Sequence, residues 1–486
     1  MSDVFEDLKP DALWQYFYEI CRVPRPSKKE GKIVIYLLRF AAAHKLEADT
    51  DEVGNVLIKK GATPGYEKKK TVVLQSHIDM VCEKNSDVDH NFDTDPIEPF
   101  IEGEWVKARG TTLGADDGIG VAAQLAILAA NDIPHGPIEC LFTVDEETGL
   151  SGAFGLKPGF LKGKILLNLD SEDEGELFIG CAGGKDTVGT LPCPTVPADI
   201  DGKAYLLKVS GLKGGHSGDD INKGLGNAIK ILNRVLWTAA KQYSLRVADI
   251  DGGNLRNAIA REAFATVIVP HGLISDFESY VKKMEKTIKY EFRSTEPNLS
   301  IKIEETGLPS KLFEKSFQEK LLNTLYALPH GVLSMSREIP NFVETSTNLA
   351  SIKMVGGKIV ISTSQRSSVE SAKESAANKL ASVFAMAEAQ TEHSSGYPGW
   401  TPNPDSEILE ITKNAYKRLF NTEPKVLAIH AGLECGVIGE KYPGMDMISY
   451  GPTIKGAHSP DERLNIDTTK KFWDLTLEVL KSISDE

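Results

Sequence analysis

The chain has 486 residues and a net charge of −14, with 41% hydrophobic and 26% charged residues. Its length exceeds that of one ordinary hydrophobic core, so two or three domains are expected. The acidic balance argues against a nucleic-acid partner, which would require clustered lysine and arginine. No apolar run reaches the ~20 residues that a membrane-spanning helix needs, so no membrane partner is expected either.

The N-terminus and the cysteines indicate a reducing compartment. The first residues, Met1 to Asp7, are acidic and lack the basic flank and apolar core of a signal peptide. Six cysteines are scattered along the chain and none forms a CxxC pair, as is usual for reduced thiols. A cytoplasmic location is therefore expected.

Helical and strand-like segments alternate in the first part of the chain. Apolar residues recur at helical spacing from Leu13 to Ile20 and again from Ile33 to Ala41. Beyond them, one stretch indicates a helix (118–130) and four apolar runs indicate strands: 55–58, 71–74, 138–144 and 165–169. Continuous apolar strands that alternate with helices predict an α/β domain whose mostly parallel sheet is covered on both faces.

The pattern changes near Pro192 to that of an α+β domain. From Tyr205 to Glu304 the order is strand, helix, strand, strand, helix, strand, which is one complete ferredoxin-like unit. Another helix, two strands and a helix follow and end near Ala389. The α/β style then resumes with strands at 426–429 and 445–450 and a closing helix from residue 468. The predicted domains are a first catalytic part, an inserted domain and a second catalytic part: 1–190, 191–395 and 396–486.

The first residues with chemical potential are His77 and Asp79. They lie at the end of a predicted strand, and the carboxyl edge of a parallel sheet is where such folds place their sites. At strand spacing the two side chains project from the same face, and a carboxylate next to a metal-binding histidine fixes its orientation. The alternative is a strand-end histidine with a solvated acid nearby.

Three further acidic clusters and one histidine complete the pattern. Asp116 and Asp117 lie between glycines just before a helix, so capping of that helix is an alternative to metal binding. Asp145, Glu146 and Glu147 directly follow an apolar strand, where such crowding is costly unless a cation neutralises it. The alternative for these three acids is a solvated loop. Asp170 follows another buried strand, where a helix cap or a turn is the alternative. His458 lies in a loop near the end of the chain, and its alternative is an ordinary surface position.

The order, spacing and strand context of these clusters resemble those of the two-zinc exopeptidases, a family that includes aminoacylase, peptidase T and carnosinase. Within it the chain looks most like the aminoacyl-histidine dipeptidases. The resemblance runs essentially end to end, and it is carried by four stretches in particular: Trp105–Asp116, Gly211–Gly218, Leu255–Ile259 and His430–Gly436.

The resemblance implies a role for each cluster. His77 and Asp170 hold one metal, Glu147 and His458 hold the other, and Asp116 bridges the two through a segment whose Asp116–Asp117 peptide bond is cis. Asp79 orients His77, and Glu146 is the general base. The implied cofactors are two Zn²⁺ ions, for which Mn²⁺ or Co²⁺ are possible substitutes. Some relatives have asparagine where this chain has Asp117, so an added acid beside the bridging ligand could shift the metal preference.

The resemblance also implies that the inserted domain is an enlarged lid with substrate-binding residues. His216 helps to polarise the scissile carbonyl, Asn257 and Arg366 hold the substrate's carboxylate end, and Glu434 holds the free α-amino group. A glycine-flanked turn is the alternative for His216, and a surface salt bridge for Arg366. In many relatives the lid histidine comes from the partner subunit, so a homodimer is expected, although an enlarged lid could supply His216 within one chain.

The expected activity is metal-dependent hydrolysis of dipeptides with a preference for Xaa-His, β-alanyl-histidine included. The partner is therefore a small peptide substrate. A deacylase or carboxypeptidase of the same family shares the metal ligands and is the first alternative. A catalytically dead binding protein on the same fold is the second, and the presence of Glu146 and all five ligand positions counts against it.

Overall fold

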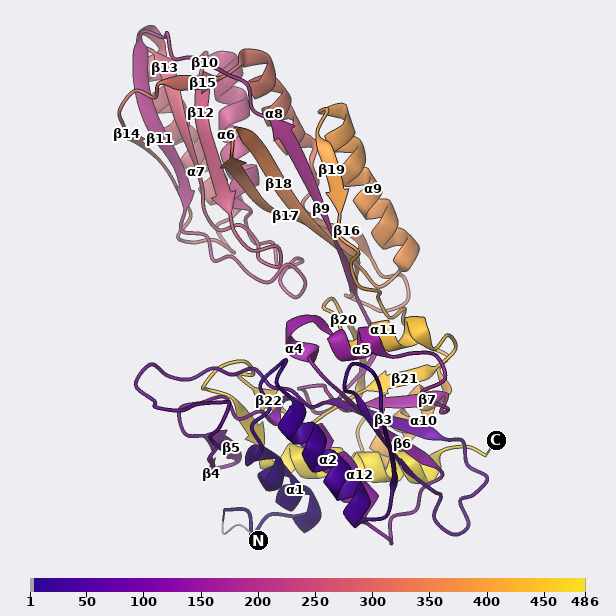
Figure 1. The fold of residues 1–486 in the computed structure, drawn as a ribbon. Helices are drawn as coiled ribbons and strands as arrows, with labels where there is room; N and C mark the ends of the chain where they lie inside the picture. The colour runs from indigo at the N-terminus through magenta and orange to yellow at the C-terminus, as the bar shows by residue number, and fades with distance from the viewer. Residues whose placement is uncertain (1–3, 486) are drawn as a thin grey trace. The chain divides into compact units, whose positions relative to one another are not determined.

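The computed structural model describes residues 4–485, so the first three residues of the acidic N-terminus lie outside the described residues. Contacts divide the chain into two units (Figure 1). Unit 1 consists of Met1–Gly180, Trp400–Ala428 and Leu433–Glu486, and unit 2 of Cys181–Gly399 and Ile429–Gly432. Unit 2 thus begins before the expected start at residue 191. It also takes Ile429–Gly432 from the segment that the sequence assigned to the catalytic domain.

Unit 1 is built on an eight-stranded sheet of order β1-β2-β6-β3-β7-β21-β8-β20. The strands are β1 (Glu47–Thr50), β2 (Val56–Lys60), β3 (Val72–His77), β6 (Ile138–Thr143), β7 (Ile165–Asn168), β8 (Glu176–Cys181), β20 (Lys425–Ile429) and β21 (Asp446–Ser449). The central strands β6, β3, β7 and β21 pair in parallel, whereas the outer pairs β1–β2, β2–β6 and β21–β8 are antiparallel. Every residue of β3, β6 and β7 is buried, so both faces of these strands are covered, as the apolar runs predicted.

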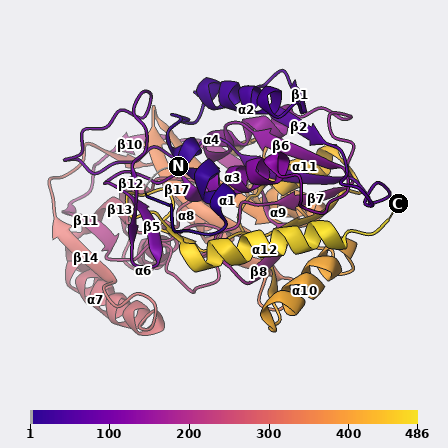
Figure 2. The ribbon, with the colours of Figure 1, turned by 90° about the horizontal axis from the view of Figure 1, so that it is seen from below.

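The longer helices of unit 1 bury apolar residues, whereas the single turn α4 has no buried residue. They are α1 (Asp11–Cys21), α2 (Gly31–Ala43), α3 (Ala115–Ala129), α4 (Glu146–Gly149), α5 (Ser151–Gly155), α10 (Glu407–Phe420), α11 (Glu434–Lys441) and α12 (Ile466–Ser482). α1 turns Leu13, Phe17 and Ile20 inward at helical spacing. α10 and α12 pack together (Figure 2), with an Arg418–Glu478 ion pair of 2.9 Å between them. No described helix is long and apolar enough to cross a membrane.

A small antiparallel sheet of order β22-β23-β5-β4 connects distant parts of unit 1. It contains β4 (Pro99–Glu102), β5 (Trp105–Ala108), β22 (Ile454–Lys455) and β23 (Arg463–Asn465). β22 and β23 form a hairpin, and β23 pairs with β5 in a register that sets Arg463 opposite Lys107. The hairpin loop 456–462 is thereby brought to the segment that leads from β5 into α3.

Unit 2 contains the predicted ferredoxin-like motif, which is β11 (Gly202–Ser210), α6 (Ala228–Gln242), β12 (Arg246–Gly253), β13 (Ala263–Pro270), α7 (Ile274–Glu291) and β14 (Ser300–Glu305). Its strands have the order β14-β11-β13-β12 and are antiparallel. Asn227 caps α6, since its side chain accepts hydrogen bonds from Ile229 N and Lys230 N. The α+β character that the sequence indicated for the inserted domain is therefore confirmed.

The sheet of unit 2 continues beyond this motif, because β12 pairs with β17 at Gly252 and Gly253. The added elements are α8 (Lys315–Ala327), β16 (Gly331–Met335), β17 (Val343–Val355), β18 (Lys358–Ser367), α9 (Glu370–Met386), β9 (Gly183–Pro192) and β19 (Gln390–His393). They give a nine-stranded sheet in which β16 pairs with β17. One apolar cluster extends from α6 and α7 to α8 and α9. The inserted domain is thus larger than one ferredoxin-like unit because further strands and helices extend the same sheet and pack on the same apolar core.

Candidate metal centre and active site

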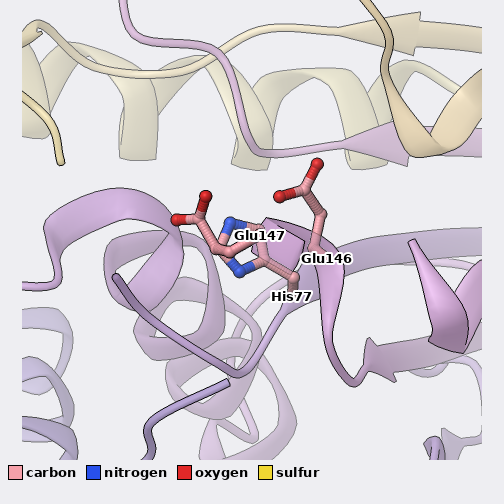
Figure 3. Close-up of side chains that lie close together, drawn as sticks. All are labelled: His77, Glu146 and Glu147. Carbon is pink, nitrogen blue, oxygen red and sulfur yellow. The ribbon is translucent and has the colours of Figure 1, made fainter. Parts of the chain in front are cut away.

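Acidic and histidine side chains gather at the carboxyl ends of three neighbouring strands of unit 1. His77 ends β3, Asp170 follows β7 by two positions, and Glu146 and Glu147 begin α4 just beyond β6. Because β6, β3 and β7 are adjacent and parallel, these ends meet at one edge of the sheet. Figure 3 shows the carboxylates of Glu146 and Glu147 on either side of the His77 ring.

Two groups of potential metal ligands share Asp116. In the first group, His77 Nε2 lies 2.9 Å from Asp116 Oδ1 and 3.4 Å from Asp170 Oδ1. In the second group, His458 Nε2 lies 3.1 Å from both Asp116 Oδ2 and Glu147 Oε2. The ligand atoms of each group lie within 4.8 Å of one another. One carboxylate oxygen of Asp116 thus faces each group, which is the arrangement expected of a bridging ligand.

This set of donors suits divalent cations. Imidazole nitrogens and carboxylate oxygens are typical ligands of zinc, and manganese or cobalt accept the same set. Hydrogen bonds to Asp116 and Glu147 raise the pKa of His458 to about 11, so positive charge is strongly favoured at this point. Glu147 Oε1 is buried and has no hydrogen-bond partner among the described residues. The residues therefore fit the two-metal centre that the resemblance implied.

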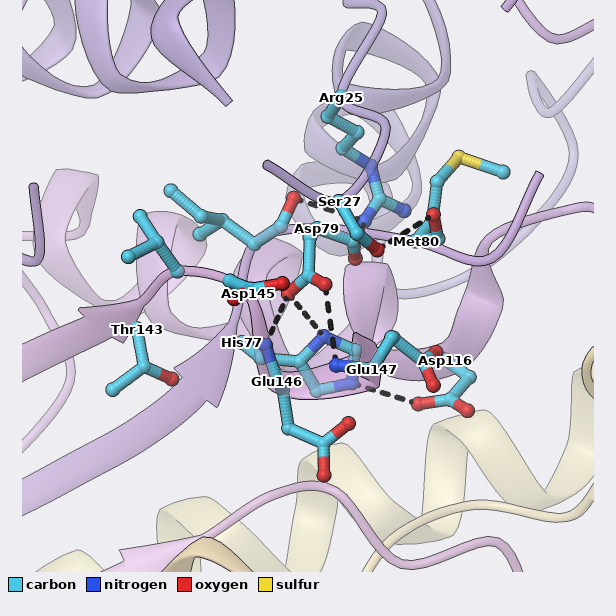
Figure 4. Close-up of polar contacts among 12 residues, drawn as sticks. Arg25, Ser27, His77, Asp79, Met80, Asp116, Thr143, Asp145, Glu146 and Glu147 are labelled. Atoms are coloured by element: carbon cyan, nitrogen blue, oxygen red, sulfur yellow. Dashed lines mark hydrogen bonds and ion pairs between the residues drawn. The ribbon is translucent and has the colours of Figure 1, made fainter. Parts of the chain in front are cut away.

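Asp79 holds one neighbouring side chain and two neighbouring backbone N–H groups. It is fully buried, and its Oδ1 lies 3.3 Å from His77 Nδ1. Glu146 N donates to Oδ1 (3.0 Å) and Glu147 N donates to Oδ2 (3.3 Å), as Figure 4 shows. Burial alone would raise the pKa of Asp79, but the contact with His77 lowers it to about 2, so the carboxylate stays charged. Asp79 therefore sets the direction of the His77 ring and the start of α4.

The adjacent acids Asp116 and Asp117 have different positions. The peptide bond between them is cis, which confirms the expectation from the resemblance. Asp116 points to both histidines, whereas Asp117 Oδ1 accepts a hydrogen bond from Gly120 N at 3.2 Å. The capping alternative considered for this pair thus describes Asp117, which caps the regular part of α3.

Glu146 has the placement and environment of a general base. Its backbone is held by Asp79, and its carboxylate points away from Asp79 (Figure 4). Burial raises the pKa of Glu146 well above its ordinary value; nearby His77 lowers it, and neighbouring carboxylates, Glu434 among them, raise it further. A carboxylate with a raised pKa can both accept a proton and release it again.

Glu434 is a buried carboxylate with one unused oxygen. It begins α11, and its Oε2 accepts hydrogen bonds from Gln75 Nε2 (2.5 Å) and Thr143 Oγ1 (2.7 Å). Its Oε1 is buried and has no partner in the part of the chain that the structure describes. Burial raises the pKa of Glu434 to about 7. Because Gln75 and Thr143 belong to β3 and β6, Glu434 lies at the same sheet edge as His77.

A second polar group lies within unit 2. Arg366 of β18 is 7% exposed, and its Nη1 donates to Tyr397 Oη at 3.0 Å. Its Nη2 lies 3.4 Å from His216 Nε2. His216 Nδ1 in turn lies 3.2 Å from Asp219 Oδ2. His216 and Arg366 thus meet within one chain, and Arg366 is buried rather than part of a surface salt bridge.

Asn257 lies beside this group on an exposed loop. Its carbonyl oxygen accepts a hydrogen bond from Ser217 N at 2.8 Å, which places it next to His216. Sequence reasoning missed Tyr397, which it used only to mark a domain boundary, and the buried His430, whose Nε2 lies 2.7 Å from Ser346 Oγ. Tyr397 lies between Gly396 and Gly399, and His430 lies two residues before Gly432; the nearby glycines are the signal by which both could have been found.

Comparison with known proteins defines the class. The profile of peptidase family M20/M25/M40 matches residues 73–482, and the chain belongs to this family. The cytosol non-specific dipeptidase of Escherichia coli (strain K12) is 44% identical over 485 residues, which are 99% of each chain. The crystal structure of the aminoacylhistidine dipeptidase from Vibrio alginolyticus matches with a TM-score of 0.94 and 46% identity, over 100% of this chain and 99% of that one.

More distant structures share the fold alone. The aminopeptidase PepT of Bacillus cereus ATCC 10987 matches with a TM-score of 0.57 at 16% identity, over 98% of this chain and 99% of that one. Together these matches confirm the resemblance to the aminoacyl-histidine dipeptidases and the expected fold class. They also confirm the enzyme class, a hydrolase of the metallo-dipeptidase type.

Proposed function

We propose that this protein is a metal-dependent dipeptidase that cleaves unblocked dipeptides and prefers histidine at the C-terminal position, β-alanyl-histidine included. One observation carries the proposal: Asp116 turns one oxygen to each of two ligand groups. The end-to-end matches to a non-specific dipeptidase and an aminoacylhistidine dipeptidase support the substrate class.

The proposed cofactors are two Zn²⁺ ions, with Mn²⁺ or Co²⁺ as substitutes. His77, Asp116 and Asp170 would hold one ion, and Asp116, Glu147 and His458 the other. When bound, a pair of such ions lowers the pKa of water and stabilises negative charge on the carbonyl oxygen of the peptide bond. The remaining steps belong to the side chains of the protein.

Glu146 is the proposed proton carrier. It accepts a proton from the attacking water and passes it to the departing amine, and its raised pKa favours such a proton carrier. Asp79 holds the backbone of Glu146 and the ring of His77, so it positions the base and a ligand together. Loss of Glu146 should therefore abolish turnover while the ligands remain.

Substrate recognition completes the proposal. Glu434 binds the α-amino group through its unused oxygen, which is supported by its burial beside Gln75 and Thr143. In unit 2, His216 assists at the carbonyl, and Asn257 and Arg366 bind the carboxylate end, since a guanidinium is suited to grip a carboxylate. We also propose a homodimer in the cytoplasm; the description of the Escherichia coli relative as cytosolic supports the location.

The deciding experiment is turnover of a dipeptide panel by chelator-treated protein, with and without added zinc. The panel contains β-alanyl-histidine, other Xaa-His dipeptides, dipeptides without histidine and an N-acetylated dipeptide. We expect cleavage that requires metal, is fastest with Xaa-His and is lost when the amino terminus is blocked. A Glu146→Gln variant prepared in parallel excludes contaminating peptidases.

Each alternative function has its own outcome in this assay. Cleavage of the N-acetylated substrate would indicate the deacylase or carboxypeptidase alternative, which shares the metal ligands. The absence of any cleavage after zinc is restored would indicate a binding protein on the same fold. Either result would reject the proposed dipeptidase.

A further inference from the structure

A single buried carboxylate holds the backbone of the segment that ends in Asp116. Glu462 is 2% exposed. Its Oε2 accepts hydrogen bonds from Leu113 N (2.7 Å) and Gly114 N (2.8 Å). Its Oε1 accepts from Ala115 N (2.8 Å) and Asp116 N (3.2 Å). Four successive backbone N–H groups therefore converge on one side chain that is distant in sequence.

The small sheet explains why Glu462 reaches this segment. Glu462 directly precedes β23, and β23 pairs with β5, the strand that leads into 109–116. The same hairpin loop, 456–462, also carries His458, whose Nε2 lies 3.1 Å from Asp116 Oδ2. One short loop thus contributes a ligand-type side chain and, four residues later, the anchor of the bridging residue's backbone.

Arg25 holds the same segment from its carbonyl side. This arginine is buried, and it donates hydrogen bonds to Gly114 O (2.5 Å) and to Asp79 O (2.7 Å). Gly114 has a φ of +69°, and a Cβ there would lie 2.6 Å from Arg25 Nη2. The peptide groups before Asp116 are therefore held on both sides, by Glu462 at their N–H groups and by Arg25 at the Gly114 carbonyl.

The two ligand groups depend on Glu462 to different degrees. Of the ligands that belong to the first group alone, His77 ends the buried strand β3 and Asp170 follows the buried strand β7, and the His77 side chain is only 1% exposed. The His458 side chain is 54% exposed and lies on the loop that Glu462 anchors. Without that anchor, the second group would lose the fixed spacing between Asp116 and His458, whereas the first would keep two independently placed ligands.

We propose that Glu462 is a positioning residue that sets the metal affinity of the group formed by Asp116, Glu147 and His458. This inference rests on the proposed two-metal function. Partners that orient metal ligands typically contribute about 10- to 100-fold to metal affinity. We therefore expect a Glu462→Gln variant to bind one metal ion as the wild type does and the other about 10- to 100-fold more weakly.

The test is a competition titration of chelator-treated protein with Zn²⁺ and a chromophoric chelator. It compares the wild type, Glu462→Gln and Asp461→Asn, the last being a control at the exposed acid next in sequence. Circular dichroism and thermal unfolding of the metal-free proteins show whether each variant is folded. If Glu462→Gln does not fold, Glu462→Asp replaces it, because aspartate keeps the charge but cannot reach all four N–H groups.

The outcomes separate this inference from the proposed function. A wild type that binds fewer than two ions would reject the two-metal function itself. Two sites in the wild type with the same affinities in the folded variant would overturn the role of Glu462. An equal loss at both sites would also overturn it, because that result indicates general damage to the fold.

Discussion

Replacing Glu434 by glutamine tests how the amino group of the substrate is recognised. In the wild type, Oε2 accepts hydrogen bonds from Gln75 and Thr143. The carbonyl oxygen of glutamine can accept both, so the variant should fold and keep these neighbours in place. Its amide nitrogen would then occupy the position of Oε1, where a substrate ammonium needs an acceptor. The variant therefore removes one interaction with little other disturbance.

The expected magnitude follows from the charge of the lost contact. A hydrogen bond to a charged group contributes about 1.5–3 kcal/mol net, so kcat/KM for unblocked dipeptides should fall about 10- to 150-fold. Burial raises the pKa of Glu434 to about 7. Below that pH the carboxyl group is protonated and cannot pair with an ammonium, so kcat/KM should fall as the pH drops through 7. In Glu434→Gln this contribution to the acid limb is removed, so the slope of the limb should decrease by about one unit.

The assay compares alanyl-histidine with propionyl-histidine, which lacks the amino group, from about pH 5 to pH 9 with zinc in excess. The preference for alanyl-histidine should shrink by the same factor as kcat/KM. Glu440→Gln, at an exposed position of the same helix, is the matched control. An unchanged preference in Glu434→Gln would refute the reasoning, whether kcat/KM stays the same for both substrates or falls equally for both.

Three further outcomes are expected. Glu146→Gln should retain zinc, measured by competition titration, but lose about 10²- to 10⁴-fold in kcat; a variant that keeps its turnover would remove the mechanism. Chelation should lower the thermal stability of unit 1, and zinc at about a thousand times its Kd should restore about 4 kcal/mol, observed by calorimetry. Burial, assisted by Arg366, holds the pKa of His430 at about 3, below the unfolded value of about 6.5. Between these values the unfolded chain binds more protons, so the stability of unit 2 should decrease as the pH drops from about 6.5 to about 3, by up to about 4–5 kcal/mol. His430→Gln should lack this dependence, as read by ¹⁹F NMR of fluorotryptophan at Trp237; an unchanged pH profile would contradict it.

The long elements could be predicted because their patterns are local. The apolar run at 138–144 and the ferredoxin-like order of the inserted domain correspond to β6 and to β11–β14. The two-residue strand β22 and the three-residue strand β23 are too short for any periodicity to appear. They exist because β23 pairs with β5, which is more than three hundred residues away in sequence, and β22 pairs with β23. The small sheet that brings His458 to Asp116 was therefore invisible in the sequence.

The candidate ligands could be predicted by residue type but not always by role. Metal coordination and proton transfer need histidine and carboxylates, so the clusters could be recognised as such. The neighbours Asp116 and Asp117 have the same side chain and the same glycine-flanked context. Only the backbone conformation decides that one faces two histidines while the other caps α3. The capping interpretation thus describes Asp117, whereas Asp116 has the position that the metal-binding interpretation requires.

The side-chain contacts to the backbone that position the site escaped prediction for a common physical reason. Asp79 holds the N–H groups of Glu146 and Glu147, Glu462 holds those of 113–116, and Arg25 holds carbonyl groups. Every residue except proline has the same backbone N–H donor and C=O acceptor. The sequence therefore does not indicate which backbone groups a side chain will bind. Unpaired buried charge is nevertheless costly, and a buried Arg25 or Glu462 therefore requires several fixed backbone partners. Substitutions at these residues should loosen the placement of ligands that remain chemically intact, and ligand-based inspection of a sequence would not detect that loss.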